Sequence, residues 1–316
     1  MAGCITNKKY VFLFPGQGAQ YTGMGLDLFD VSDEARDLFT LASEVIGHDA
    51  KKLLAEAGGE TLKRSDIAQP AITLVNLAAA AVLRSRGIRP CACAGHSLGE
   101  YAALTACGVI SAEDSLRLTA WRGQLMQEAV SALGEAGGGM AAVIGIPGAE
   151  VEKAVNGWTA AGLRDLYVAN LNAPLQTVVS GTAEALAEAE TRFKEAGARR
   201  FIRLAVAGPF HSPLMAEAAD KFAAALDRVS FADPVVPFFS NVTGKCVTSG
   251  LEARDLVLRQ ICSPVRWFDQ EKAIAETTPD AAVEAGPGKT LSGLWKDAGV
   301  PIPCFPAGKL ADINKI

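Results

Sequence analysis

The chain has 316 residues, of which 49% are hydrophobic, and its formal net charge is -5. That much apolar sequence is enough to bury the core of one large domain or of two modest ones. The acidic balance argues against a nucleic-acid-binding protein, because such proteins usually carry a basic surface. We therefore expect a globular protein with no nucleic-acid partner.

The cysteines and the apolar stretches indicate the cellular compartment of the protein. The seven cysteines are scattered and form no Cys-x-x-Cys pair, so we expect no metal site and thiols that act as small buried hydrophobes in a reducing compartment. The apolar run at residues 10–14 is too short for a signal peptide. The longest apolar stretch, residues 71–83, is too short to cross a bilayer. These features predict a cytoplasmic protein that binds no membrane.

The chain opens with a predicted strand at residues 11–14, and a glycine-rich loop follows at residues 15–20. The loop lacks the dinucleotide-binding pattern Gly-x-Gly-x-x-Gly, because Tyr21 stands where the third glycine is required. It is either a simple turn or a loop that offers a backbone amide to an anion. Residues 27–54 have a polar helical pattern, and the apolar pattern of residues 71–84 predicts a buried helix.

Residues 95–99 read Gly-His-Ser-Leu-Gly, which fits the pattern Gly-x-Ser-x-Gly. Small residues at 91–94 favour a buried strand before it, and residues 100–106 favour a helix after it. This setting is typical of a nucleophile elbow, in which Ser97 is held in a strained backbone conformation. We expect the amides of Ser97 and Leu98 to point at the reacting carbonyl. The alternative is a glycine-rich turn with an unreactive serine.

The next helix is predicted to begin after Ser111, which forms a capping box with Asp114. Its core-facing stripe consists of Leu118, Trp121 and Leu125. Arg122 lies within this stripe, and burying a guanidinium alone is costly. Its partner is therefore a buried carboxylate, or water reached by the tip of the side chain, or a substrate carboxylate held by two hydrogen bonds.

After residue 128 the pattern changes to short alternating elements. The strands are predicted at residues 140–146, 166–170, 176–180 and 201–204, and the helices at residues 149–155 and 183–196. The order β-α-β-β-α-β is the ferredoxin-like plan. We expect a flexible glycine joint at residues 137–139 and a turn at residues 172–174. Residues 129–204 would then be an inserted subdomain, residues 1–128 and 205–316 one large α/β domain, and the active site the cleft between them.

Elimination selects one of the three histidines as a base. His96 lies in the elbow, where its side chain should point away from Ser97, and His48 lies in a polar segment upstream. His211 follows a glycine-proline loop just before a helix, and it comes after Ser97, as the base does in the α/β-hydrolases. The alternative is a histidine on a surface loop.

The remaining elements are strands at residues 235–240 and 281–284 and a helix at residues 256–261. A Gly-Lys-Thr sequence at residues 288–290 is not a phosphate-binding P-loop, because Val283 stands where its first glycine is required. We interpret it as a loop and helix start near the cleft.

Taken together, these segments resemble the malonyl-CoA:acyl-carrier-protein transacylases of fatty-acid synthesis. The resemblance runs from about Val11 to Phe305. The motifs that carry it are Phe14-Pro15-Gly16-Gln17-Gly18, Gln69-Pro70-Ala71, Gly95-His96-Ser97-Leu98-Gly99-Glu100-Tyr101, the helix with Arg122, Gly208-Pro209-Phe210-His211-Ser212 and Glu284-Ala285-Gly286-Pro287-Gly288. It implies a hydrolase-like parallel-sheet core with a ferredoxin-like (βαββαβ) insertion.

The resemblance also implies roles for particular residues. Ser97 would be the nucleophile and His211 its acid and base, with the backbone amides of Gln17 and Leu98 as the oxyanion hole. Arg122 would bind the malonyl carboxylate. The backbone carbonyl of Gln260 would orient His211, which makes the site a Ser–His dyad without a third acid.

The implied reaction moves a malonyl group from malonyl-CoA to the phosphopantetheine thiol of acyl carrier protein, through a malonyl-serine ester. No cofactor is expected, since malonyl-CoA is a substrate, and we expect a monomer. The alternatives are a polyketide-type acyltransferase with another acyl-CoA, a serine esterase or thioesterase, and a carrier-binding module without activity.

Overall fold

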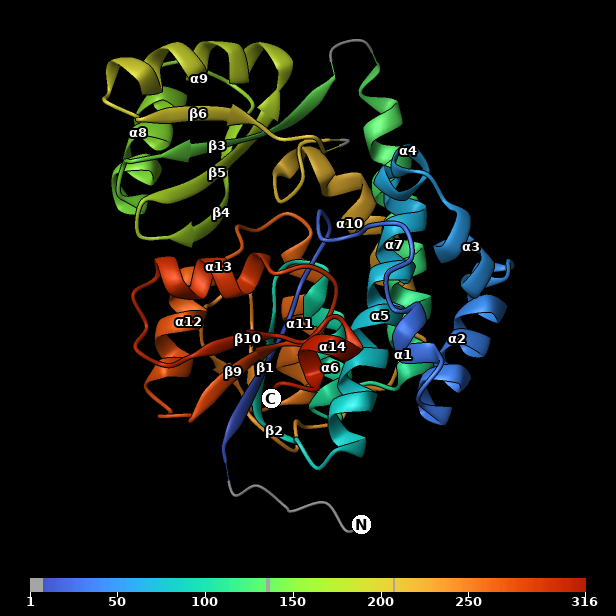
Figure 1. Cartoon of the computed structure of the whole chain (residues 1–316). Helices are drawn as coiled ribbons and strands as arrows, with labels where there is room; N and C mark the ends of the chain where they lie inside the picture. The colour runs from blue at the N-terminus through green and yellow to red at the C-terminus, as the bar shows by residue number, and fades with distance from the viewer. Residues whose placement is uncertain (1–7, 135–136, 207) are drawn as a thin grey trace.

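The computed structural model describes residues 8–134, 137–206 and 208–316, so one of the seven cysteines, Cys4, lies outside the described residues. A six-stranded mixed sheet forms the centre of the larger part of the molecule (Figure 1). Its strand order is β10-β9-β1-β2-β7-β8, and neighbours are parallel except for β7 and β8. The strands are β1 (Tyr10–Phe14), β2 (Pro90–Gly95), β7 (Phe238–Phe239), β8 (Cys246–Val247), β9 (Ala281–Glu284) and β10 (Cys304–Pro306). The carboxyl ends of β1 and β2 therefore lie at one edge of the sheet, where ligands bind in α/β folds.

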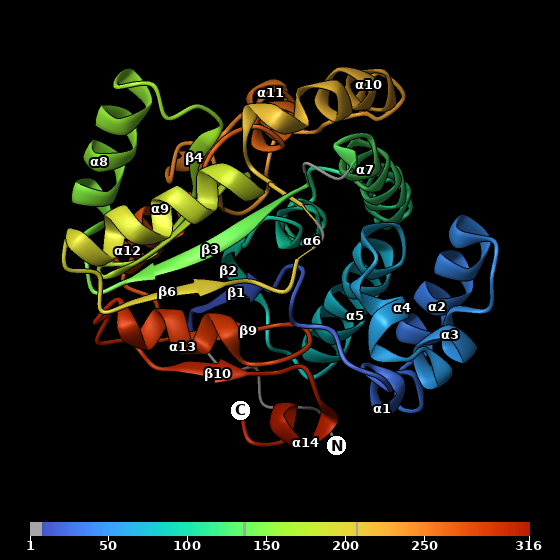
Figure 2. The ribbon, with the colours of Figure 1, turned by 90° about the horizontal axis from the view of Figure 1, so that it is seen from above.

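Strand β1 is apolar throughout because both of its faces are covered. Phe12 and Phe14 pack into the core that includes α5 and α6, whereas Val11 and Leu13 pack with residues of α12 and α13. The helices of this part are α1 (Leu26–Phe29), α2 (Asp33–Ile46), α3 (Ala50–Glu56), α4 (Gly59–Lys63), α5 (Ser65–Ser85), α6 (Gly99–Ala106), α7 (Ala112–Ala132), α10 (Ala216–Leu226), α11 (Gly250–Gln260), α12 (Trp267–Ala275), α13 (Thr290–Asp297) and α14 (Leu310–Ile313), with a 3-10 turn at Pro213–Met215. Figure 2 shows α1 to α4 on the far side of α5 from the second sheet.

Helix α5 is longer than the apolar pattern predicted, since it begins at Ser65 rather than at residue 71. Pro70 lies inside the helix, where its missing N–H leaves the carbonyl of Asp66 without the usual intrahelical partner. The helix is long and apolar enough to cross a membrane, but 89% of its most apolar window is buried inside the fold. It contacts α2, α6 and α7, as expected of a core helix.

A second, antiparallel sheet has the order β4-β5-β3-β6 and lies at one end of the molecule with α8 and α9 (Figure 1). Its elements are β3 (Gly138–Ile144), α8 (Gly148–Ala160), β4 (Leu166–Ala173), β5 (Gln176–Thr182), α9 (Ala183–Glu195) and β6 (Arg200–Arg203). The predicted sequence of elements is confirmed. Along β3, Ala141 and Val143 pack in the core with α8 and α9, while Met140 and Ala142 face the opposite way, into a cavity.

Several boundaries differ from the prediction. Gly138 and Gly139 are not a joint but the first residues of β3, because they pair with Thr182 and Gly181 of β5. Strand β4 continues through residues 172 and 173, which were predicted as a turn.

The ends of two other predicted segments move as well. The strand at residues 235–240 shrinks to the two residues of β7. The predicted segment boundary at residue 129 falls inside α7, and the second sheet with its two helices spans residues 138–203.

Backbone pairing ties the second sheet to the larger part. The Leu171 amide donates to the Val265 carbonyl at 2.8 Å, and the Val265 amide donates to the Ala169 carbonyl at 2.8 Å. Strand β4 therefore has a fixed position beside the segment that leads into α12.

The cysteines differ in burial. The six described cysteines are all free thiols. Cys93 and Cys107 are buried as expected, whereas Cys246 is exposed.

Candidate active site

The predicted elbow is present between β2 and α6. Ser97 has a φ of 50°, the left-handed conformation that a side chain rarely adopts. A Cβ atom at Gly99 would lie 1.9 Å from the carbonyl oxygen of Phe14, and one at Gly95 would lie 2.0 Å from the carbonyl carbon of Gly99. Both glycines are thus required by close backbone contacts, and the tight turn holds Ser97 at the amino end of α6.

Ser97 and His211 are brought together although 114 residues separate them. The Oγ atom of Ser97 lies 2.7 Å from Nε2 of His211. On the other side of the ring, Nδ1 lies 3.0 Å from the carbonyl oxygen of Gln260 at the end of α11. Because that oxygen can only accept, Nδ1 carries the proton and Nε2 is free to accept one from Ser97.

The surroundings of His211 keep its ring neutral. The residue is only 4% exposed and has a φ of 57°. Burial, with a further effect of the positive charge on Arg122, lowers the pKa of His211 to about 3. A neutral imidazole at this position can take a proton from Ser97, and no carboxylate is needed to orient it.

The hydrogen bonds of the backbone amides around Ser97 differ from the prediction. The Ser97 N–H donates to Oδ1 of Asn241 at 2.7 Å, so the expectation that it points at the reacting carbonyl is wrong. Within the described ranges, the amides of Gln17 and Leu98 have no hydrogen-bond acceptor. A Cβ at Gly16 would lie 3.5 Å from the Leu98 nitrogen, so the glycine loop after β1 runs beside the elbow. Two amides close to Ser97 are therefore free to bind an anion.

Arg122 is buried on α7 and is held by side-chain amides. Its Nη1 donates to Oε1 of Gln69 at 2.9 Å, and its Nη2 donates to Oε1 of Gln260 at 3.1 Å. It is 2% exposed, and none of the ion pairs between described residues includes it. Among the described residues no carboxylate pairs with it, and its tip does not reach solvent, so two of the three alternatives left by the sequence are wrong. A guanidinium has five N–H donors, and these two bonds leave others for a ligand.

One cavity of about 260 Å³ joins these groups. The larger part lines it with the glycine loop, Ser97, Arg122, His211 and the start of α13. The second sheet lines the opposite side with Met140, Ala142, Asn170, Asn172, Gln176 and Val178. The cavity therefore lies between the two sheets, where the sequence predicted a cleft.

His96 lies in the same cavity but is turned toward the second sheet. Its Nε2 lies 2.8 Å from Oδ1 of Asn172, and its ring packs edge-on against Trp267 with centroids 5.4 Å apart. It makes no hydrogen bond with Ser97 or His211. Burial lowers the pKa of His96, so this ring too is neutral.

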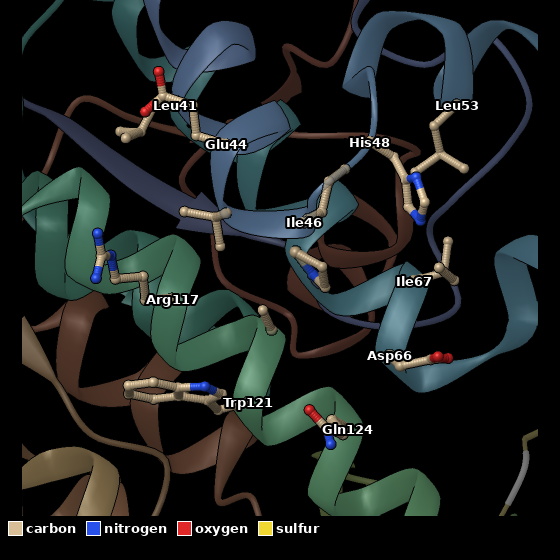
Figure 3. A pocket seen from close by; sticks show the side chains of 13 residues that line it. Leu41, Glu44, Ile46, His48, Leu53, Asp66, Ile67, Arg117, Trp121 and Gln124 are labelled. Carbon is tan, nitrogen blue, oxygen red and sulfur yellow. The ribbon is translucent and has the colours of Figure 1, made fainter.

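A larger cavity of about 570 Å³ lies elsewhere, between α2, α5 and α7 (Figure 3). His48, Arg117 and Trp121 line it, together with Glu44 and Asp66. It contains none of the predicted site residues, and the part of the chain that is described places no nucleophile against His48 there. The smaller cavity therefore holds the chemically competent groups.

Three polar residues of the site were not singled out from the sequence. Asn241 bridges the elbow, since its Oδ1 accepts from Ser97 and its Nδ2 donates to the Gly95 carbonyl at 2.6 Å. Gln69 holds Arg122, and Glu100 contacts both Gln260 and Asn241. Gln69 and Glu100 stand in motifs that carry the family resemblance, whereas Asn241 follows the short strand β7.

Comparisons with known proteins agree with this geometry. The model of the acyl transferase domain family matches residues 11–299. A malonyl CoA-acyl carrier protein transacylase of Bacillus subtilis is 41% identical over 289 residues, which cover 91% of this chain and 90% of the relative.

Two solved structures have the same fold. An acyl carrier protein S-malonyltransferase from Vibrio cholerae superposes with a TM-score of 0.91 at 36% identity, covering 97% of this chain and 99% of the other. A malonyl-transacylase in complex with a type II PKS acyl-carrier protein superposes with a TM-score of 0.91 at 35% identity, covering 97% and 98%. The chain therefore belongs to the acyl transferase family and, within it, to the malonyl-CoA:acyl-carrier-protein transacylases.

Proposed function

We propose that this protein transfers a malonyl group from malonyl-CoA to the phosphopantetheine thiol of acyl carrier protein through a malonyl-serine ester. The observation that carries the proposal is the Ser97–His211 contact of 2.7 Å in the same cavity as the buried Arg122. Ser97 and His211 supply a nucleophile and its base, and Arg122 supplies a site for a carboxylate.

In the first half-reaction, Ser97 Oγ attacks the thioester carbonyl while Nε2 of His211 takes its proton. The backbone amides of Gln17 and Leu98 bind the oxyanion, and removing one such donor typically costs about 3–4 kcal/mol. The carbon–sulfur bond then breaks, His211 returns the proton to the leaving sulfur, and coenzyme A departs. The product on the protein is a malonyl ester of Ser97.

In the second half-reaction, the thiol of the carrier's phosphopantetheine arm attacks the ester, and His211 takes the thiol proton. The oxyanion again lies at the amides of Gln17 and Leu98. The ester bond to Ser97 breaks, and His211 protonates Oγ. The carbonyl of Gln260 holds the ring in the required orientation through both steps, since Nδ1 keeps its proton.

Arg122 gives the site its preference for a dicarboxylic acyl group. Each charge-assisted hydrogen bond to a carboxylate is worth roughly 1.5–3 kcal/mol, so two parallel bonds supply a large preference over an acetyl group. Phe210 and Met126 line the cavity beside it and limit its size.

A transfer assay in which the carrier protein competes with water as the acceptor tests the proposal. Malonyl-CoA is incubated with the protein and a carrier protein that bears phosphopantetheine, and the carrier is analysed by mass spectrometry. We expect a malonyl thioester on the carrier and little free malonate. Release of free malonate at a rate independent of the carrier would identify a hydrolase instead, and carrier binding without transfer would identify an inactive binding module.

The pathway is a separate question from the chemistry. A polyketide-type acyltransferase with another acyl-CoA uses the same dyad, and competition between malonyl-, methylmalonyl- and acetyl-CoA distinguishes the two. The guanidinium has no carboxylate partner among the described residues, which favours an acyl group with a carboxylate over acetyl. We propose malonyl rather than methylmalonyl because a relative named malonyl CoA-acyl carrier protein transacylase is 41% identical to this chain.

We further propose that the second sheet and its two helices, residues 138–203, are an inserted ferredoxin-like subdomain on a hydrolase-like core, with the boundary after α7 rather than at residue 129. The strand order β4-β5-β3-β6 with two helices supports this assignment. The proposal also includes a cytoplasmic monomer that works without a metal or other cofactor and binds neither nucleic acid nor membrane.

A further inference from the structure

Glu100 is a buried carboxylate that the reaction itself does not use. It lies in the first turn of α6 and is 1% exposed. One carboxylate oxygen accepts the Asn241 backbone N–H at 2.8 Å, and the other accepts Nε2 of the Gln260 side chain. Both partners are donors, so the arrangement favours the ionised carboxylate, which accepts at both oxygens.

The Gln260 side chain connects this carboxylate to Arg122. Its Oε1 accepts from Arg122, and its Nε2 donates to the Ser97 carbonyl at 2.9 Å as well as to Glu100. An arginine can only donate and a carboxylate can only accept, so the amide has a single possible orientation. Glu100 and Arg122 are therefore opposite charges joined by one amide.

We propose that Glu100 is a positioning residue for acyl-group selection: through the Gln260 amide it holds the Arg122 guanidinium in place for the acyl carboxylate. The inference rests on the proposed function, because it concerns how the carboxylate-binding arginine is fixed. The anion also offsets part of the cost of burying a guanidinium. Burial lowers the pKa of Arg122, whereas the negative charge of Glu100 raises it.

Glu100 has a second effect, through Asn241, that must be separated from the first. Asn241 fixes the elbow by bonding to Gly95 and Ser97, so its displacement slows every acyl donor alike. Only the contact with Gln260 bears on the choice between acyl groups. The informative quantity is therefore the ratio of kcat/KM for malonyl-CoA to kcat/KM for acetyl-CoA.

The test compares the wild type, Glu100→Gln, Arg122→Ala and the double variant. Burial raises the pKa of Glu100 to about 7, so the assays are run at about pH 8, where the carboxylate is ionised. Glu100→Gln keeps the shape but removes the charge, and its NH2 group must face a donor. We expect the malonyl/acetyl ratio to fall roughly tenfold or more in Glu100→Gln. In the Arg122→Ala background, the same change should leave the ratio unaltered, because the group it acts through is gone.

Two further variants keep the test decisive. Gln260→Ala keeps the backbone carbonyl that holds His211 but removes the side-chain amide that connects Glu100 to Arg122. It should therefore lower the malonyl/acetyl ratio. This variant still tests the connection if Glu100→Gln does not fold. Glu113→Gln, an exposed carboxylate on α7 that pairs with Arg117, should leave the ratio at the wild-type value.

The outcomes separate the inference from the function on which it rests. An unchanged or raised ratio in Glu100→Gln or Gln260→Ala, with Arg122→Ala losing malonyl preference, would overturn the role of Glu100 alone. An equal fall caused by Glu100→Gln with and without Arg122 would also overturn it. A wild type that transfers no malonyl group, or an Arg122→Ala variant with the wild-type ratio, would contradict the proposed function instead.

Discussion

The two sides of the cavity differ in how their polar groups are held. On the elbow side, which consists of Gln17, Ser97, Arg122 and His211, side chains are fixed by bonds to residues from distant segments. On the sheet side, strands β3, β4 and β5 contribute mainly apolar or amide side chains, and Asn172 bonds to His96.

This difference indicates that the two sides of the cavity have different functions. The proposed nucleophile, base and carboxylate-binding arginine lie on the elbow side, where many hydrogen bonds hold a strained backbone in place. The sheet side supplies shape and one amide contact. Changes on the elbow side should therefore affect the chemical step, and changes on the sheet side should affect mainly substrate binding.

Replacing the nucleophile should have the largest effect. Ser97→Ala removes the hydroxyl that we propose carries the acyl group, and losses of roughly 10⁴- to 10⁶-fold in kcat are typical for such a residue. The initial rate of transfer to the carrier protein measures it. Ser131→Ala, an exposed serine near the end of α7, is the matched control and should keep the wild-type rate. A Ser97→Ala variant with a tenth of the wild-type rate would refute the assignment.

Arg122→Ala should change selectivity more than basal chemistry. Loss of a bidentate contact to the malonyl carboxylate is expected to lower malonyl transfer roughly a hundredfold more than acetyl transfer. The measurement is kcat/KM for the two acyl-CoAs. Arg117→Ala, on the same helix but at the larger cavity, provides the control with an unchanged ratio. Equal losses for both donors would remove the role assigned to Arg122.

Because His211 is buried in its neutral form, we expect the difference in stability between the wild type and His211→Gln to depend on pH. Its pKa is about 3 in the folded protein and about 6.5 in the unfolded chain, so the unfolded state binds more protons between these values. The free energy of unfolding should therefore fall as the pH drops below about 6.5, by at most about 1.4 kcal/mol per pH unit. His211→Gln lacks this effect, so urea unfolding at several pH values should show the wild type losing its advantage on acidification. A difference that stays constant over this range would mean that the ring is not buried in its neutral form.

A change on the sheet side should have the smallest effect. Asn172→Ala removes the partner of His96, and we expect KM to rise a few-fold with kcat nearly unchanged, since a neutral hydrogen bond is worth roughly 0.5–1.5 kcal/mol. Steady-state kinetics with malonyl-CoA measure it. A large fall in kcat would show that the sheet side takes part in the chemical step and would end the distinction between the two sides.

Local sequence signals were sufficient for several elements around the site. The Gly-x-Ser-x-Gly turn, the cap at Ser111 and the strand at residues 281–284 each depend on neighbouring residues, and the structure has all three. The start of α5 was missed because its first turn is polar and Pro70 normally marks a boundary. The role of the glycines at 138 and 139 was missed because a β-sheet partner more than forty residues away keeps them extended.

The hydrogen-bond partners of the proposed catalytic groups were harder to predict. Asn241 and Glu100 act through contacts with residues more than 140 positions away, and an asparagine after a strand is usually a turn residue. The sequence likewise suggested that Ser97 would offer its own amide, since nothing local indicates that Asn241 would accept it. The family resemblance named Gln260 for its carbonyl, but its side chain contacts Arg122, Ser97 and Glu100 as well.

The covalent intermediate is the most direct test of the account. The wild type and Ser97→Ala are each incubated briefly with malonyl-CoA in the absence of a carrier, and their intact masses are measured. We predict one malonyl group on the wild type, mapped to the peptide that contains Ser97, and none on the variant. Turnover to free malonate with no adduct, or an equal adduct on both proteins, would contradict the central role of Ser97.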